Sequence, residues 1–391
     1  MRPAVPGPES FPYLETFSNL FKEAGYTFSR LQELFPDTTL TGRDVSRLEE
    51  YRQSVERSEH RAHRLARLWL LREPLERPLW NQLMGSEMVV QGLSHGLING
   101  SALTHLEACF DLHPAQNALI LTDPKFRHQW EEDQQGVYYL GSDSYGLIHA
   151  LPRDSVGSVL DLFTGSGVHA VLAVSHAEEV TGVDINPRAV ALATANAALN
   201  GCGDRCQFVQ GDLYQPVEGR TFDLITANPP FVPTPDQDLA LYRSGGESGE
   251  FLTARVLARL HEFLNPGGRL AMVTNYPVFE DVDIVDHHRS LLGCPDQFGI
   301  ALLHSYTFPN EMYVGMHLAP TGDLEKDRQA RLRWLESYRK NRIAGVGFGV
   351  LFFENLESGH PWSAREDGVD LVHRPLGEQV SQWLRQAASR H

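Results

Sequence analysis

The chain has 391 residues with a formal net charge of −16 at pH 7, and 42% of its residues are hydrophobic and 21% charged. This length and composition predict a soluble globular enzyme of two or three domains. No apolar run approaches the roughly 18 residues of a membrane helix, and the acidic balance argues against a protein that coats nucleic acid.

The N-terminal third predicts helices followed by a pair of strands. Residues 10–72 place apolar side chains at helical spacing, and the first eight residues lack the apolar core of a signal peptide. Two short helices and then two strands are expected over Leu79–Leu83, Met88–Leu97, Leu103–Leu112 and Ala118–Thr122. This is the element order of a winged helix.

We expect residues 1–135 to form a helical, winged-helix-like domain for substrate binding or dimerisation. Residues 88–97 carry no cluster of Arg, Lys or Asn that would indicate a DNA recognition helix. Binding to DNA is therefore not the favoured role of this domain.

A glycine-rich turn follows the next apolar segment. Ser158–Phe163 predicts a strand, and Thr164–Ala170 breaks it before a helical stretch. Gly165 and Gly167 allow a tight turn and the close approach of a ligand. The spacing also fits the dinucleotide fingerprint, so an NAD-linked oxidoreductase is one alternative.

Acidic residues near the ends of three predicted strands indicate which kind of ligand this part of the chain binds. Asp161 would repel a pyrophosphate but suits a cationic amino-acid head group. Asp184 closes the next strand, where an acid can bind both ribose hydroxyls, and Asp212 ends the third, where an acid can accept from an adenine amino group. Asp161 therefore favours a cationic ligand over NAD, whereas an acid in the place of Asp184 would serve either cofactor.

The turn Asn228-Pro229-Pro230-Phe231 follows the strand Phe222–Ala227. The Asn228 side-chain oxygen and the Pro229 carbonyl can each accept one proton of a planar –NH2 group. The prolines remove two backbone donors, and Phe231 can lie flat against the planar group. With a methyl donor beside it, this turn predicts an N-methyltransferase.

Strands and helices alternate through this part of the chain. Strands are expected at 158–162, 179–184, 206–210, 222–227 and 269–274, with helices at 168–176, 187–199 and 249–264. This order predicts a parallel α/β sheet with helices on both faces and ligands at the carboxyl ends of its strands. Asn265–Gly268 predicts a stop and turn, and 300–308 and 346–354 predict the final strands.

The four motifs together resemble the class I S-adenosylmethionine (SAM) methyltransferases, over roughly residues 138–310. Within that class they are similar to the small-domain group, which includes the release-factor glutamine and ribosomal-RNA guanine and adenine N-methyltransferases. The resemblance implies a Rossmann-like methyltransferase domain over 136–391 and SAM as the cofactor.

The resemblance assigns roles to the motif residues. Asp161, Gly165 and Gly167 would line the methionine end of SAM, Asp184 would bind its ribose, and Asp212 would approach its adenine. Asn228 and Phe231 would hold the acceptor. The neighbouring residues of the expected cofactor site are Phe163, Thr164, Ile185, Asn186 and Leu213.

The acceptor is expected to carry a planar –NH2 group. A nucleobase in RNA is favoured, with a protein glutamine or a small metabolite as alternatives, and a non-catalytic SAM-binding regulatory protein is the alternative from another class. A basic segment over Arg328–Arg342, inside a predicted insertion at 319–345, is either a solvated helix face or a phosphate-recognising surface. The loop Tyr242–Glu247 and Tyr139, Ser142 and Asp143 are further candidates near the substrate.

The cysteines and adjacent histidines predict no metal site. Cys202 and Cys206 lack a second pair or nearby histidines, and His287 and His288 would point about 100° apart on a helix. Four cysteines without a disulfide framework fit a reducing cytoplasm. The sequence does not indicate an oligomeric state.

Overall fold

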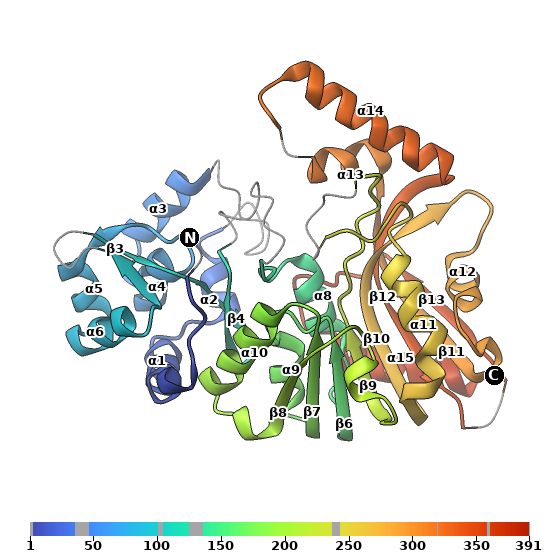
Figure 1. Cartoon of the computed structure of the whole chain (residues 1–391), viewed down its shortest axis with the longest axis horizontal. Coiled ribbons are helices and arrows are strands. Elements are labelled where there is room, and N and C mark those ends of the chain that lie inside the picture. The colour runs from blue at the N-terminus through green and yellow to red at the C-terminus, as the bar shows by residue number, and fades with distance from the viewer. Residues whose placement is uncertain are drawn as a thin grey trace.

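The computed structural model describes residues 3–35, 47–100, 105–124, 136–236, 243–318, 320–357 and 360–390. Figure 1 shows a mostly helical N-terminal part beside a large sheet flanked by helices. The predicted α/β fold class is confirmed.

The N-terminal part is built from short helices around an aromatic core. Trp69 contacts Phe17 and Phe21 edge to face, with ring centroids 4.8 and 6.0 Å apart. The helices of this part are α1 (Phe11–Glu23), α2 (Phe28–Gln32), α3 (Leu48–Glu56), α4 (Arg61–Trp69), α5 (Arg77–Met84) and α6 (Ser86–Ser94).

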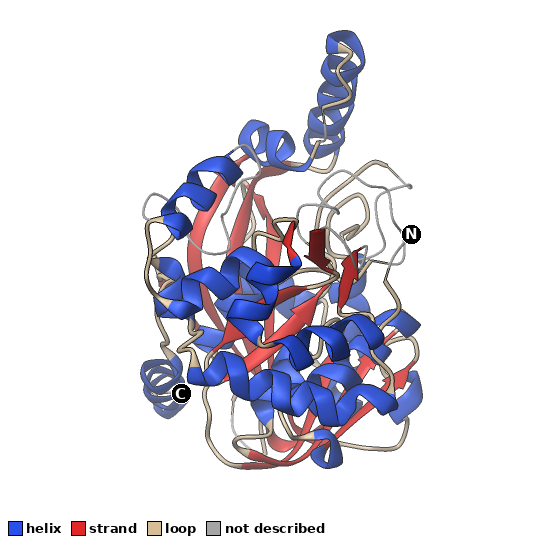
Figure 2. Ribbon diagram, turned by 90° about the vertical axis from the view of Figure 1, so that its left-hand side faces the viewer, coloured by secondary structure: helices blue, strands red, loops and turns tan. Residues whose placement is uncertain are grey.

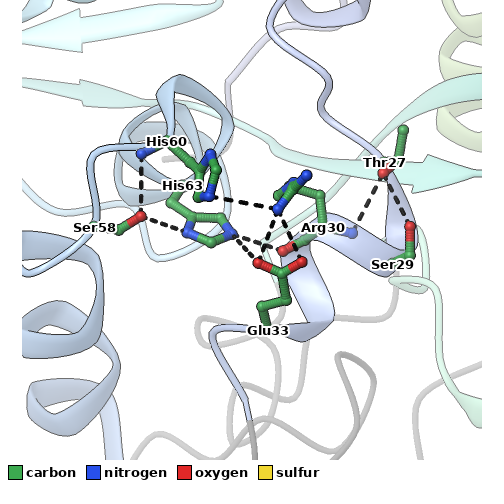
Figure 3. Close-up of polar contacts among 7 residues, drawn as sticks. All are labelled: Thr27, Ser29, Arg30, Glu33, Ser58, His60 and His63. Atoms are coloured by element: carbon green, nitrogen blue, oxygen red, sulfur yellow. Dashed lines mark hydrogen bonds and ion pairs between the residues drawn. The ribbon is translucent and has the colours of Figure 1, made fainter.

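His63 of α4 links this helix to α2 through hydrogen bonds. One of its ring nitrogens lies 2.7 Å from the Ser58 hydroxyl and the other 2.7 Å from the Arg30 carbonyl oxygen (Figure 3). The ring is nearly inaccessible to solvent. Because both ring nitrogens are used, His63 has a structural role.

A small antiparallel sheet completes a winged helix. Its strands are β1 (Leu75–Glu76), β2 (Ile98–Gly100) and β3 (His105–Ala108), in the order β1-β3-β2. Along the chain the order is α4, β1, α5, α6, β2, β3. This is a winged-helix order, but its wing is formed by β2 and β3 and not by the strands predicted at Leu103–Leu112 and Ala118–Thr122. Helix α6 is in the position of a recognition helix and contains no Lys or Arg.

The single strand predicted over Leu103–Leu112 is wrong, and Leu103 itself lies outside the described residues. A new strand, β4 (Asp111–Ala115), begins after β3 and pairs with β5 (Ala118–Thr122) in a separate hairpin. This hairpin forms hydrogen bonds with α10 (Pro187–Leu199). The Asn196 side-chain amide accepts from the Leu121 N–H and donates to the Leu121 carbonyl, both at 2.8 Å.

Helix α10 also contributes to the core of the N-terminal part. Ala189, Leu192, Ala195 and Leu199 are buried in the same apolar cluster as the side chains of α1 and α4. The N-terminal part and the part that contains the large sheet are therefore packed together. Their division into two domains near residue 135 stays a prediction.

The central sheet has eight strands within the described residues, in the order β13-β11-β12-β10-β9-β6-β7-β8. Strands β6 to β10 run parallel, and β12 is antiparallel to both β10 and β11. Their bounds are β6 (Val156–Leu162), β7 (Ala177–Asp184), β8 (Cys206–Gln210), β9 (Phe222–Ala227), β10 (Leu264–Phe279), β11 (Phe298–Pro309), β12 (Ile343–Asn355) and β13 (Ser363–Asp367).

The strand order reverses between β6 and β9. The chain extends from β6 to β7 and β8 on one side, then returns to place β9 and β10 on the other. Ligands bind at such a switch point, outside the carboxyl ends of the strands.

Helices cover both faces of the sheet. On one face, α11 (Phe251–Phe263) and α12 (Ile284–Ser290) pack against β9 and β10. On the other, α8 (Ser142–Ala150), α9 (Val168–Ala173) and α15 (Gly377–Ser389) contribute to a second cluster. The predicted turn at Asn265–Gly268 is instead an irregular start of β10, where its pairing with β9 shifts register before Arg269.

The predicted insertion at 319–345 contains one helix, α14 (Leu324–Lys340), and a second helix, α13 (Asn310–His317), precedes it. α13 follows β11, and α14 lies at the top of the molecule in both views (Figures 1 and 2). Asp323 begins α14 as its N-cap, accepting from the backbone N–H groups of Glu325 and Lys326.

A buried ion pair ties α10 to the segment after β5. The Arg188 guanidinium donates to both oxygens of Asp123, at 2.5 and 2.9 Å, and only 1% of the Asp123 side chain is exposed. The Val137 N–H also donates to Asp123, at 2.9 Å. Asp123 therefore connects three separate stretches of chain.

Replacing Arg188 with Met should lower the free energy of unfolding by about 3 kcal/mol, because it leaves a buried carboxylate without its cation. Urea unfolding of the full chain measures the loss. The control is Arg385→Met, which breaks an exposed 3.8 Å pair with Asp154 and should cost less than about 1 kcal/mol. Equal losses in the two variants would contradict this role of Arg188.

Candidate active site

A cavity of about 750 Å³ lies at the switch point. One side is formed by the segment before α8 and the turns after β6, β7, β8 and β9. The other side is formed by β10, β11, β12, α13 and the segment that begins at Arg243. The predicted motifs therefore meet in one place, together with elements from the C-terminal third.

The glycine-rich turn after β6 borders the cavity through Phe163, Thr164 and Gly165. Phe163, Gly165 and Gly167 have positive φ angles of 57°, 53° and 78°. A Cβ atom on Gly167 would lie 2.7 Å from the Cβ of Ala193, so α10 leaves room only for glycine there. Phe163 adopts a backbone conformation that costs a non-glycine residue energy.

Asp161 lies behind this turn and does not line the cavity. The hydroxyl groups of Thr164 and Thr226 donate to its two carboxylate oxygens at 2.6 and 2.7 Å. Burial raises the pKa of Asp161 to about 6, although both hydrogen bonds favour the ionised form. Asp161 therefore contacts the turn and the strand β9, and its expected contact with the ligand stays a prediction.

Asp184 reaches the cavity from the end of β7. One carboxylate oxygen accepts from the Gly165 N–H and the other from the Asn186 N–H, both at 2.9 Å. Burial raises the pKa of Asp184. Each oxygen retains a lone pair that can accept from a ligand hydroxyl.

The residues after Asp184 have different surroundings. Ile185 lines the cavity and is 50% exposed. Asn186 caps α10, because its side-chain oxygen accepts from the Arg188 N–H at 3.0 Å. Ile185 therefore offers an apolar surface to a ligand, while the Asn186 side-chain oxygen is used within the fold.

Asp212 lines the cavity after β8, but its carboxylate is paired. Arg255 of α11 donates to both of its oxygens, at 3.2 and 2.8 Å. Leu213 follows with a positive φ of 51° and also lines the cavity. An adenine amino group at Asp212 would have to share this carboxylate with Arg255.

The Asn228 side chain is oriented by an acid from another element. Its amide Nδ2 donates to Asp143 Oδ2 of α8 at 2.9 Å, which leaves Oδ1 as the atom able to accept from a ligand. Burial raises the pKa of Asp143, against the effect of the bond from Asn228. Pro229, Pro230 and Phe231 also line the cavity.

Sequence analysis missed the wall formed by the C-terminal strands. Tyr306 and Phe308 of β11 and Phe348 of β12 border the cavity, and the Tyr306 ring centroid lies 4.7 Å from that of Phe308 and 5.3 Å from that of Phe348. Asn275 of β10 donates to the Tyr313 hydroxyl at 3.0 Å, which leaves its oxygen available. No motif marks these residues, because the sheet brings them to the site.

The basic segment of α14 is partly neutralised. Arg328 pairs with Glu325 at 2.7 Å, and Arg333 pairs with Asp236 at 2.8 Å. Trp334 Nε1 also donates to Asp236, at 2.6 Å. Through these contacts with Asp236, one face of α14 holds the segment that follows Asn228–Phe231.

The adjacent histidines of α12 do not form a metal site. His287 pairs with Glu250 at 2.9 Å, and His288 is buried against the Ile284 carbonyl at 2.8 Å. No group of three or more potential metal ligands occurs among the described residues. Likewise, none of the helices in the described ranges is both long and apolar enough to cross a membrane.

Comparison with known proteins identifies the family. The family described as "Methyltransferase small domain" matches residues 138–281, which include the turns after β6, β7, β8 and β9. A Methanocaldococcus jannaschii protein with a provisional name as a protein N5-glutamine methyltransferase is 35% identical over 138 residues, covering 34% of this chain and 68% of that protein. The chain belongs to the methyltransferase small domain family.

Other relatives in the family have different named acceptors. A ribosomal RNA small subunit methyltransferase C from Alcanivorax borkumensis is 32% identical over 37% of this chain and 43% of its own length. A release factor glutamine methyltransferase from Koribacter versatilis is 33% identical over 39% of this chain and 59% of its own length. These two matches span about half of each relative, and they confirm the expected family resemblance.

Asp161 predicts a pH dependence of stability. Its pKa is raised by folding from an ordinary value of 3.8 to about 6, so the folded state binds the proton more tightly. Relative to an Asp161→Asn variant, the wild-type chain should lose on the order of 3 kcal/mol of stability as pH rises from about 4 to 7. Urea unfolding of both proteins across this range measures the difference, and parallel stability curves would contradict the shift.

Proposed function

We propose that the protein is a SAM-dependent N-methyltransferase. It transfers a methyl group to a planar amino or amide nitrogen, and a nucleobase in RNA is the favoured acceptor. The observation that carries the proposal is the orientation of the Asn228 amide by Asp143. Asn228 lines the same cavity as the glycine-rich turn and the aromatic wall, which consists of Tyr306, Phe308 and Phe348.

The donor half of the cavity fits SAM by the chemistry of its residues. The tight turn at Gly165 and Gly167 allows close approach to the backbone, and Asp184 offers acceptors to ribose hydroxyls. Ile185 and Leu213 supply apolar surface for an adenine ring. The Asp161 carboxylate behind the turn favours a cationic head group and disfavours the pyrophosphate of NAD.

The acceptor half is suited to a planar group with two N–H donors. Asn228 Oδ1 and the Pro229 carbonyl provide acceptors, and Phe231 provides a flat surface. When both protons of an –NH2 group are held, its nitrogen lone pair points in one direction. The nitrogen can then face the donor half of the cavity.

Bound SAM supplies a methyl group already activated on a sulfonium, so the protein's contribution is positioning. Hydrogen bonds to Asn228 and Pro229 favour the pyramidal nitrogen whose lone pair is available. They also stabilise the positive charge that develops on that nitrogen. The proton can leave afterwards, and this scheme needs no obligatory general base.

The aromatic wall favours a nucleobase among the acceptors. Tyr306, Phe308 and Phe348 offer ring surfaces for stacking on an unpaired base. Protein glutamine is the second candidate, because relatives are named for it, and a small metabolite is the third. An intact, oriented Asn228 argues against a purely regulatory SAM-binding protein.

The acceptor class can be tested with purified protein and tritium-labelled methyl-SAM. The substrate is a lysate from a host that lacks this gene, separated into RNA, protein and small molecules. Label in RNA supports the proposal. Label in a protein band or in the small-molecule fraction would show that the acceptor is a protein or a small molecule and not RNA. Absence of label in every fraction, with SAM shown to bind by calorimetry, would overturn the catalytic assignment.

Replacing Asn228 with Ala should abolish most turnover, by at least about 100-fold, while SAM affinity changes little. Replacing Asp184 with Ala should instead weaken SAM binding by roughly 1.5–3 kcal/mol, the loss of a charge-assisted hydrogen bond. Calorimetry and methyl-transfer assays on both variants separate the two roles. Near-normal turnover in Asn228→Ala would contradict the assignment of Asn228 to acceptor binding.

Asp143 should act on turnover through Asn228. An Asp143→Leu variant leaves the Asn228 amide free to rotate and should lower kcat about 10- to 100-fold, with unchanged affinity for S-adenosylhomocysteine. An Asp143→Asn variant can still offer an oxygen to Asn228 and should retain most activity. If both variants lose activity equally, orientation of Asn228 is not the function of Asp143.

A further inference from the structure

Arg243 is a cation in the acceptor half of the cavity. It lies in the loop expected to close over the substrate, of which Tyr242 falls outside the described residues. Its carbonyl oxygen accepts from the Val232 N–H at 2.9 Å, and the Gly245 N–H donates back to the Val232 carbonyl at 3.0 Å. These bonds fix Arg243 directly beside the turn Asn228–Phe231.

Its guanidinium has no carboxylate partner among the described residues. Nη2 donates to His317 Nδ1 at 3.0 Å and to the His317 carbonyl at 3.2 Å, and no hydrogen bond within the described ranges uses its other nitrogens. Arg255, which also lines the cavity, is neutralised by Asp212. Arg243 is therefore a half-buried positive charge with donors available to a ligand.

His317 offers a second hydrogen-bond donor next to the Arg243 guanidinium. Burial, and then the charge of Arg243, lower its pKa to about 3, so the imidazole is neutral at physiological pH. Since Nδ1 accepts from Arg243, the proton resides on Nε2. His317 lines the cavity, so an N–H donor stands beside the guanidinium.

We propose that Arg243 and His317 bind a phosphate of the acceptor while the aromatic wall holds its base, which makes the acceptor a nucleotide unit of RNA. Guanidinium groups bind phosphate oxygens through charge-assisted hydrogen bonds. Arg243, His317, Asn228, Tyr306 and Phe308 all line one cavity, which can therefore hold a base and its phosphate together. This inference rests on the proposed function and narrows its acceptor class.

The test is calorimetry on the full chain saturated with S-adenosylhomocysteine. The probes are the four ribonucleoside 5′-monophosphates and the four matching nucleosides. At least one monophosphate should bind about tenfold more tightly than its nucleoside, as expected for hydrogen bonds to a charged group. Arg243→Gln should remove this difference and leave the nucleoside affinity unchanged, and Arg243→Lys should retain part of it.

The matched control is Arg385→Gln on α15, which removes the same charge from a side chain that is 64% exposed. It should leave every affinity unchanged. Unaltered monophosphate affinity in Arg243→Gln overturns the proposal, as does the absence of any preference for a monophosphate, which would favour a protein or uncharged acceptor. Weakened S-adenosylhomocysteine binding would instead assign Arg243 to the donor's carboxylate.

Methyl transfer is not measured in this experiment. Loss of the nucleotide preference and loss of N-methylation are therefore separate outcomes. The proposed function is tested by methyl transfer to the lysate fractions and by the Asn228→Ala assay, and the phosphate site is tested by this binding experiment.

Discussion

Two hydrogen bonds to the buried Asp161 carboxylate hold the functional end of the sheet together. Thr164 donates from the glycine-rich turn and Thr226 from the strand that leads into Asn228. The turns on either side of the switch point are thus fixed relative to one another. Methyl transfer depends on the distance and angle between donor and acceptor, so this carboxylate can affect the reaction without touching either ligand.

The acceptor side is assembled from parts that are distant in sequence. Asp143 precedes Asn228 by 85 residues and orients its amide, while α14 fastens the following loop through Asp236. Arg243, which donates to His317 74 residues away, is a local positive charge in a chain with a net charge of −16. An acidic protein can therefore bind a phosphate where its cations lack acidic partners, because local charge acts over a Debye length of about 10 Å.

The N-terminal winged helix offers no basic recognition helix, since α6 contains neither Lys nor Arg. Its core includes apolar side chains of α10, and Arg188 of α10 forms a buried ion pair with Asp123 after β5. Because Asn186 caps this same helix directly after Asp184, the packing of the N-terminal part also supports the donor side. This arrangement gives the extension a structural role independent of any binding to nucleic acid.

The sequence by itself determined the parallel α/β core, the order of its motifs and their placement at strand ends, because the apolar strand segments and the glycine-rich turn are local signals. It did not reveal the β4–β5 hairpin, the separation of Asp161 from the cavity, or the pairing of Asp212 with Arg255. Tertiary structure alone decided that Tyr306, Phe308 and Phe348 line the same cavity as Asn228. Contacts between residues far apart in the chain depend on strand order and helix packing, which no local pattern encodes.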